Sequence, residues 1–258
     1  MTTTAEIPRA RTATTYDVGP VPVTVYERDR VQPFLLLHGG AGPATVAGFG
    51  DLLAAREHTR VIMPVHPGFD GTPRPDSLAS VRDLARLYGR LLDDLDLGDV
   101  TVIGNSIGGW LAAELALLNS PRISGAILID AVGADVPGHP VTDVSGLSRE
   151  QLTALSFYDP ARAAPRPGSP GPTPEMVQAN MAALFAYAGP AMNDPTLLDR
   201  LKDLDLPVHV IWGEADGIAG PDYGRALAAA IPGARFTLVP RAGHLPQVEA
   251  PEELLGVI

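Results

Sequence analysis

Short apolar runs rich in β-branched residues alternate along this chain with longer segments of helical periodicity, a pattern typical of an α/β sheet. We predict a mostly parallel eight-stranded sheet with helices on both faces, its strands at residues 14–18, 23–27, 34–37, 60–64, 100–104, 125–130, 207–213 and 235–240. The last six runs are continuously apolar, which favours buried central strands, whereas the first two alternate as an antiparallel, solvent-facing entry would. Helical spacing predicts helices at residues 77–97, 111–118, 221–230 and 251–257.

The alternation stops between residues 130 and 207. Six prolines between Pro160 and Pro174 predict an extended or mobile loop there. A helix is then predicted to begin after Thr173, with Pro174 in its first turn. Its apolar residues either pack on the main domain or line a substrate pocket; they are Met176, Val177, Met181, Leu184, Phe185 and Ala188.

The composition excludes several classes of partner. The chain has 258 residues, which indicates one domain, or one domain with an insertion. A net charge of −11 without a basic cluster argues against nucleic acid and against anionic membranes. The absence of cysteine excludes disulfides and thiolate metal sites. No apolar run could span a bilayer and no signal sequence is evident, so we expect a cytoplasmic protein, monomeric or homodimeric, without metal or cofactor.

A serine stands where a predicted strand turns sharply into a predicted helix. Ser106 lies in Gly104-Asn105-Ser106-Ile107-Gly108, a G-x-S-x-G pattern. Small residues two positions either side suit a turn in which backbones approach closely. Ser106 is therefore either an activated nucleophile or a simple helix N-cap.

A second loop, His38-Gly39-Gly40, follows the strand at residues 34–37. A serine nucleophile generates an oxyanion, which needs preorganised N–H donors. We predict that Gly40 and Ile107 supply them, with Ala41 as the second choice to Gly40. The same loop nearly matches a dinucleotide fingerprint, but Thr45 replaces the third glycine of that pattern.

Two further polar residues follow predicted strands. Asp216 comes after the strand at residues 207–213, and His244 after that at residues 235–240. Because the carboxyl ends of parallel strands share one edge of a sheet, Ser106, Asp216 and His244 can meet there. The spacing of histidines and carboxylates does not resemble a metal site.

These motifs resemble those of the α/β-hydrolase superfamily along nearly the whole chain: "LLLHGG", "HPGFDGTPRP", "GNSIGGW", "WGEADGI" and "AGHLPQVEAPEEL". The resemblance implies that Ser106 is the nucleophile, His244 the base and Asp216 the acid that orients it, with Asp130 a second candidate acid. It also implies a cap inserted after the sixth strand. We expect a core of residues 1–133 and 201–258, and a cap of residues 134–200.

The apolar helix of this cap favours a small to medium apolar carboxylic ester or lactone as substrate. We expect His38, Met176, Met181, Phe185 and Leu245 to line the pocket. Cleavage would pass through an acyl-enzyme.

Two alternatives stay open. The stretch "GNSIGG" also resembles carbon–carbon bond hydrolases that act on vinylogous diketone acids, and Arg162 or Arg166 could bind the substrate carboxylate. Those enzymes usually carry tryptophan where this chain has Leu245. The other alternative is a ligand-binding protein without turnover.

Overall fold

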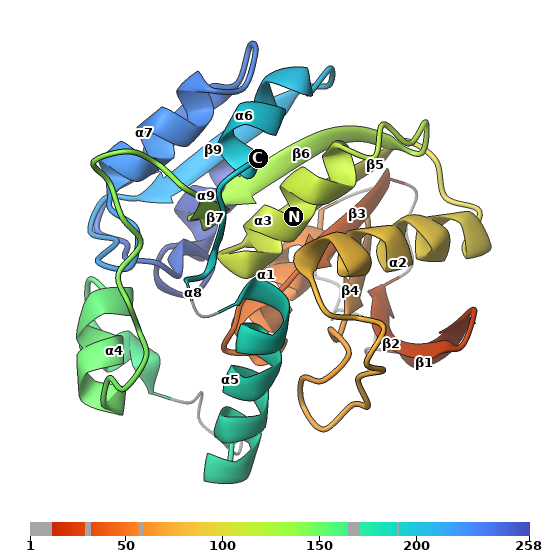
Figure 1. The fold of residues 1–258 in the computed structure, drawn as a ribbon, viewed down its shortest axis with the longest axis horizontal. Helices are drawn as coiled ribbons and strands as arrows, with labels where there is room; N and C mark the ends of the chain where they lie inside the picture. Colours follow the sequence, from red (N-terminus) through yellow and green to blue (C-terminus); the bar gives the residue numbers. More distant parts are fainter. Residues whose placement is uncertain (1–11, 29–31, 57–58, 165–170, 190) are drawn as a thin grey trace, which may run out of the picture.

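The structure is a computed structural model that describes residues 12–28, 32–56, 59–164, 171–189 and 191–258. Eight strands form one sheet in the order β1-β2-β4-β3-β5-β6-β9-β10 (Figure 1). β1 pairs antiparallel with β2 and β2 with β4, whereas the other neighbours are parallel. The strands are β1 (Thr12–Val18), β2 (Val21–Arg28), β3 (Gln32–Leu37), β4 (Thr59–Pro64), β5 (Val100–Asn105), β6 (Ile123–Ile129), β9 (Val208–Gly213) and β10 (Arg235–Val239).

All eight predicted strands are present, and the antiparallel entry is confirmed. The prediction of six central strands was wrong for β10, which among the described residues forms one edge of the sheet and pairs with β9 alone. Its apolar residues Phe236 and Leu238 are half-buried, and only Val239 at its end is buried. Phe236 is covered by the guanidinium of Arg225, 4.9 Å from its ring centre, so a continuous apolar run does not require a second neighbouring strand.

Helices cover both faces of the sheet because successive strand residues point to opposite sides. Leu35 and Leu37 of β3 belong to one apolar core and Phe34 and Leu36 to the other. The first core is covered by α2 (Val81–Asp94), α3 (Ile107–Ala116) and α7 (Pro221–Ala229). The second is covered by α1 (Ala44–Ala54), α8 (Pro246–Glu249) and α9 (Pro251–Val257).

Residues 130–207, between β6 and β9, form the inserted segment. It contains β7 (Gly133–Ala134), α4 (Arg149–Ser156), the 3-10 turn η1 (Pro160–Ala163), α5 (Pro174–Ala188), β8 (Asn193–Asp194), α6 (Leu197–Arg200) and the 3-10 turn η2 (Leu201–Asp203). α4 and α5 both lie below the sheet in the view of Figure 1. The two ends of the segment meet because β7 pairs with β8.

The first proline of the predicted loop, Pro160, begins the 3-10 turn η1, which the Asp159 side chain caps. Residues 165–170 of that prediction lie outside the described residues. α5 begins as predicted, with the Thr173 side chain accepting from the Met176 N–H (3.3 Å).

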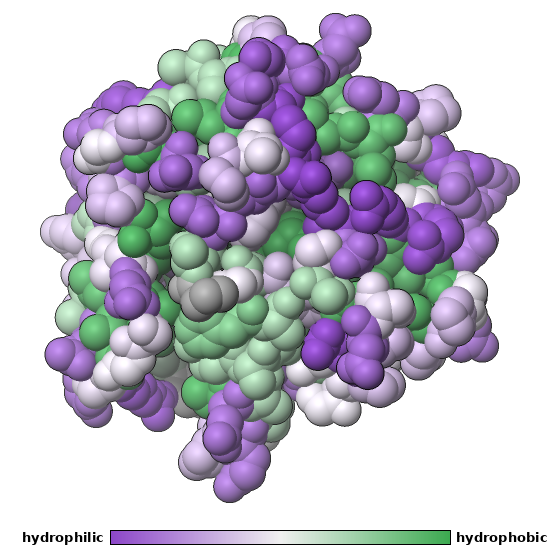
Figure 2. All heavy atoms as spheres, in the orientation of Figure 1, coloured by the Kyte–Doolittle hydropathy of each residue, from purple (hydrophilic) through white to green (hydrophobic). Residues whose placement is uncertain are grey.

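The apolar stripe predicted on α5 is confirmed in part: Leu184 and Ala188 are buried, and Met181 and Phe185 pack against the core. Val177 is 48% exposed. The buried residues of the helix are Asn180, Ala183, Leu184, Tyr187 and Ala188. The buried face is the one that meets two loops of the core, where Leu184 contacts Gly40 and the polar Asn180 is hydrogen-bonded to Asp70. Figure 2 shows hydrophobic side chains gathered along α5.

An ion-pair network anchors the end of the inserted segment to the core. Glu114 on α3 is buried, and both of its oxygens accept from the Arg200 guanidinium. Arg200 also contacts Asp194, which in turn binds Arg82 of α2. Paired charges of this kind are costly to break singly, because removing one leaves the other buried and uncompensated.

Within the described ranges, no helix combines the length and apolar character that crossing a membrane requires.

Candidate active site

Ser106 lies at the tight turn between β5 and α3, with φ 60° and ψ −123°. This backbone conformation is unusual for a residue other than glycine and is held by the surrounding structure. The Ser106 N–H donates to Ile129 O (2.9 Å), and its carbonyl accepts from the amides of Gly109 (2.9 Å) and Trp110 (3.1 Å). Ser106 occupies the N-cap position of α3, yet among the described residues its side chain makes no capping hydrogen bond. The simple N-cap interpretation therefore does not explain this serine.

The glycines around Ser106 are required by close backbone contact, as the sequence predicts. A Cβ on Gly104 would lie 1.9 Å from Gly108 O. One on Gly108 would lie 2.4 Å from Leu37 O. Neither neighbour is a flexible side chain that could move away.

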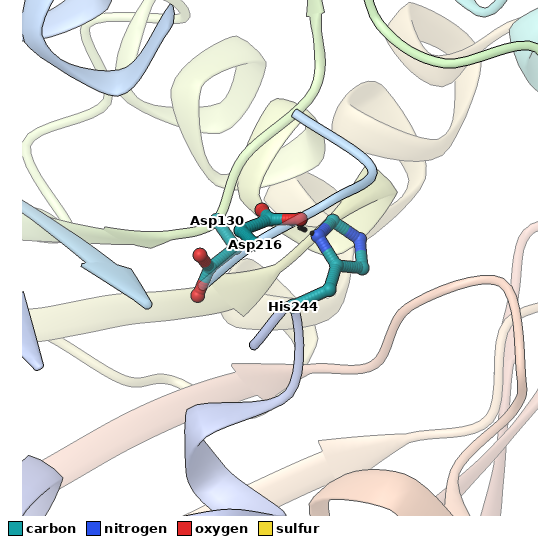
Figure 3. A group of neighbouring side chains, drawn as sticks. All are labelled: Asp130, Asp216 and His244. Atoms are coloured by element: carbon teal, nitrogen blue, oxygen red, sulfur yellow. Dashed lines mark hydrogen bonds and ion pairs between the residues drawn. The ribbon is translucent and has the colours of Figure 1, made fainter. Parts of the chain in front are cut away.

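Asp216 and His244 meet at the carboxyl ends of β9 and β10. His244 Nδ1 donates to Asp216 Oδ2 over 2.8 Å, and both side chains are buried (Figure 3). The other oxygen, Asp216 Oδ1, accepts from the amides of Ile218 (2.8 Å) and Ala219 (3.1 Å). These three donors hold the carboxylate in one orientation and leave His244 Nε2 as the nitrogen that can accept a proton.

Asp130, the second candidate acid, is fully buried beside this pair at the end of β6. Its Oδ1 accepts from the Gly213 N–H (2.8 Å), while Oδ2 has no hydrogen-bond partner among the described residues. Burial, and then the charge of Asp216, raises the pKa of the Asp130 carboxyl well above its usual value. In this structure it is therefore Asp216, and not Asp130, that contacts His244.

Asp130, Asp216 and His244 also offer ligand atoms within 4.8 Å of one another. A metal there would need His244 Nδ1 unprotonated, but that nitrogen donates to Asp216. The cluster is explained by the histidine–carboxylate hydrogen bond.

The loop that carries His244 is held by its backbone. The His244 N–H donates to Ser156 O (2.8 Å), and the His244 carbonyl accepts from Asn105 Nδ2 (2.9 Å). Asn105 precedes Ser106, so one side chain links the turn at the serine to the histidine loop. Gln247 Nε2 fixes Asn105 from the other side, donating to its Oδ1 (3.0 Å).

The His38-Gly39-Gly40 loop lies beside the serine: a Cβ on Gly39 would be 3.2 Å from the Cβ of Ser106. The ring of His38 stacks on that of His66 at 3.8 Å. His38 Nδ1 donates to Gly39 O, and Nε2 accepts from the His66 N–H. Both ring nitrogens are thus used within the protein, and burial lowers the pKa of His38 to about 4, so the ring is neutral.

His66 holds the same loop by a hydrogen bond to its backbone. Its Nε2 donates to the His38 carbonyl (3.1 Å), and its Nδ1 accepts from the Tyr88 hydroxyl (2.7 Å). Burial lowers the pKa of His66 well below the usual value, with the neighbouring His38 adding to the effect.

α5 lies directly over the loop with Gly40. A Cβ on Gly40 would be 2.8 Å from Leu184 Cδ2. Asn180 accepts from the Asp70 N–H (2.9 Å) and donates to the Asp70 carboxylate (3.2 Å), and the Tyr187 hydroxyl donates to Pro67 O (2.8 Å). The helix is therefore fastened to the turn at residues 66–72 by side-chain hydrogen bonds.

For the other residues predicted to line the pocket, the structure gives burial and not a contact with Ser106, Asp216 or His244. Met176, Met181, Phe185 and Leu245 are each half-buried, and Met181 and Phe185 pack against the core. Arg162 is exposed on η1, and Arg166 lies outside the described residues. Ile107 begins α3, where the first amides of a helix have no acceptor within it.

Sequence reasoning assigned no role to two residues that shape this site, Asn180 and Glu249. Each is buried and polar. Both stand near other polar residues, in "VQANM" and "QVEAPEE", a pattern equally typical of solvent-facing positions.

Comparisons with known proteins identify the family of this chain. The alpha/beta hydrolase family model matches residues 34–257. A 2-hydroxy-6-oxononadienedioate/2-hydroxy-6-oxononatrienedioate hydrolase of Cupriavidus pinatubonensis is 28% identical, over 83% of this chain and 81% of the relative. A 2-hydroxymuconate semialdehyde hydrolase of Pseudomonas putida is 27% identical, over 88% and 85%.

Solved structures show the same fold. A meta-cleavage product hydrolase from Pseudomonas fluorescens superposes with a TM-score of 0.77 at 21% identity, over 95% of both chains. A serine hydrolase involved in carbazole degradation gives a TM-score of 0.76 at 21% identity, over 96% of this chain and 97% of that one. With the family model matching most of its length, this chain belongs to the alpha/beta hydrolase family.

Proposed function

We propose that this protein is a hydrolase of carbon–carbon bonds in vinylogous diketone acids, compounds with a 2-hydroxy-6-oxo-dienoate skeleton. The observation that carries the proposal is the set of curated relatives, which are named for such substrates and match over more than 80% of this chain. The hydrogen-bonded Asp216 and His244, at the same sheet edge as Ser106, are compatible with that chemistry.

The expectation of an ester or lactone hydrolase was wrong. It rested on the apolar residues of α5, and an apolar pocket wall suits either substrate class. The names of the relatives favour the carbon–carbon bond hydrolase that the "GNSIGG" motif left open.

Ser106 acts as the nucleophile in the proposed mechanism. The substrate first moves its enol proton from O2 to C5, which leaves ketones at C2 and C6. Ser106 Oγ then bonds to C6 as its proton passes to His244 Nε2, while Asp216 stabilises the imidazolium. The amides of Gly40 and Ile107 hold the oxyanion.

The C5–C6 bond breaks next, and its electron pair moves through the conjugated chain to O2, which takes the proton from His244. The leaving group is thus a hydroxydienoate, and C6 stays bonded to Ser106 as an ester. Water attacks this acyl-enzyme, gives a proton to His244 and releases a carboxylic acid. One water is consumed, and Ser106 regains its proton.

In this proposal the inserted segment is a cap over the site. Residues 134–200 form the cap, and residues 1–133 and 201–258 form the core. α5 supports this role because Leu184 contacts the Gly40 loop. The helix has no basic residue between Pro174 and Ala188. Arg162 and Arg166 therefore remain the candidates for binding the substrate carboxylate, which comparing the acid with its methyl ester would test.

The test compares wild type, Ser106→Ala and the exposed-serine control Ser145→Ala. Each is assayed by the loss of dienoate absorbance with 2-hydroxy-6-oxo-dienoates and by hydrolysis of p-nitrophenyl esters. We expect wild type and Ser145→Ala to cleave the dienoates with the higher kcat/KM, and Ser106→Ala to lose roughly a millionfold in kcat. Efficient ester hydrolysis without dienoate cleavage would refute the proposal.

A further inference from the structure

Glu249 ends α8, five residues after His244, and its side chain is buried, with the residue 8% exposed. Its carboxylate accepts three backbone hydrogen bonds. Oε2 binds the Gly243 N–H (2.6 Å) and the Tyr158 N–H (3.0 Å), and Oε1 binds the Asp159 N–H (2.9 Å). One side chain thus joins the His244 loop to the segment that follows α4.

The end of α4 also contacts the His244 loop, and the loop that carries Asp216, through its own backbone carbonyls. Leu155 O accepts from the Gly217 N–H (2.9 Å), next to Asp216. Ser156 O accepts from the His244 N–H (2.8 Å). A Cβ on Gly243 would lie 2.5 Å from Ser156 O, so this approach is close. The end of α4 therefore lies between the loop that carries Asp216 and the loop that carries His244.

The three amide contacts require a carboxylate. A glutamine has a single acceptor oxygen, and its NH2 group would face at least one N–H donor. Hydrogen bonds from amides to a charged acceptor are also stronger than neutral ones. Among the described residues, the salt bridges do not include Glu249, so these amides are what stabilises its buried charge.

We propose that Glu249 is a positioning residue that fastens the histidine loop to the end of α4, so that His244 is correctly placed only while α4 is docked. The residue acts through Gly243 and does not contact the reacting atoms. This inference rests on the proposed role of His244 as the base that activates Ser106.

The test compares Glu249→Gln with Glu252→Gln, an exposed glutamate on the adjacent helix α9. The first readout is the rate at which an alkyl fluorophosphonate labels Ser106, followed by intact mass. That rate reports nucleophile activation whatever the natural substrate is. The second readout is kcat and KM for a 2-hydroxy-6-oxo-dienoate.

For Glu249→Gln we expect labelling and kcat to fall roughly ten- to a hundredfold with KM within about twofold, because a small displacement of the base costs rate more than binding. Glu252→Gln should match wild type. Labelling of a folded Glu249→Gln within twofold of wild type would overturn the inference. If wild type is labelled but does not cleave dienoates, the proposed substrate fails while the role of Glu249 is still decided by labelling.

Hydrogen exchange on wild type provides an independent test if the variant does not fold. The amides of Tyr158, Asp159 and Gly243 all lie outside strands and helices. If Glu249 fastens them together, they should exchange slowly and at similar rates, since one opening frees all three. Fast or unrelated exchange at these amides would contradict the proposal.

Discussion

Replacing Asp130 by asparagine should make the protein more stable at neutral pH, because it exchanges a buried ionisable group next to the candidate active site for a neutral one of the same shape. Burial and the Asp216 charge raise the pKa of Asp130, so the folded protein keeps this proton at pH values where the unfolded chain has lost it. The unfolded pKa is about 3.9. Between that value and the raised pKa the folded state binds more protons than the unfolded state, so stability falls as pH rises.

The slope follows from proton linkage. One proton held only by the folded state lowers the free energy of unfolding by about 1.4 kcal/mol for each pH unit across this window. Asparagine does not ionise, so it makes no pH-dependent contribution to the free energy of unfolding. Its Oδ1 can accept from the Gly213 N–H as Asp130 Oδ1 does, and its Nδ2 supplies a donor where the unpartnered oxygen of Asp130 now lies.

Urea unfolding at pH 4, 5, 6 and 7 measures the effect, with the exposed Asp76→Asn as control. The stability gained by Asp130→Asn should be small at pH 4 and grow with pH by about 1.4 kcal/mol per unit until the raised pKa is passed. Parallel curves for variant and wild type would refute the reasoning. Activity should be kept, since the Asp216–His244 hydrogen bond is untouched; loss of activity would instead assign Asp130 as the acid.

Three other changes have expected outcomes. His38 and its stacked partner His66 are buried and neutral. As the pH is lowered from the unfolded pKa of about 6.5, and down to about 4 for His38, the contribution of each ring to the free energy of unfolding should fall by about 1.4 kcal/mol per pH unit, opposite in sign to that of Asp130; urea unfolding measures it. Gly104→Ala should cost more than about 4 kcal/mol or prevent folding, whereas Gly98→Ala, with open space around it, should raise stability by up to about 1 kcal/mol; thermal unfolding compares them. Asn180→Ala should cost about 1–3 kcal/mol in chemical denaturation, because it removes both hydrogen bonds to Asp70.

Much of the sheet could be predicted because each strand corresponds to a short apolar run in the sequence. The turn at Ser106 was also readable, since close backbone contact leaves glycine as the residue that fits at 104 and 108. These features depend on neighbours in the sequence, or on the general rule that parallel strands end at one edge.

The buried face of α5 could be predicted only in part. Its phase depends on which loops of the core it meets, and the polar Asn180 is buried because Asp70, 110 residues away, supplies both partners. Glu249 is a similar case, with donors some 90 residues distant in the sequence. Single-residue patterns contain no information about such pairs.

The contact between α4 and the loops that carry Asp216 and His244 has a consequence for how the sequence of this family member can diverge. The atoms that α4 presents to Gly217 and His244 are the carbonyls of Leu155 and Ser156, which every amino acid possesses. Substitutions at these two positions leave the acceptors in place, but inserting or deleting a single residue would move them along the chain and away from both loops. Related sequences are therefore expected to conserve the number of residues in this segment more strictly than the identity of the residues at positions 155 and 156.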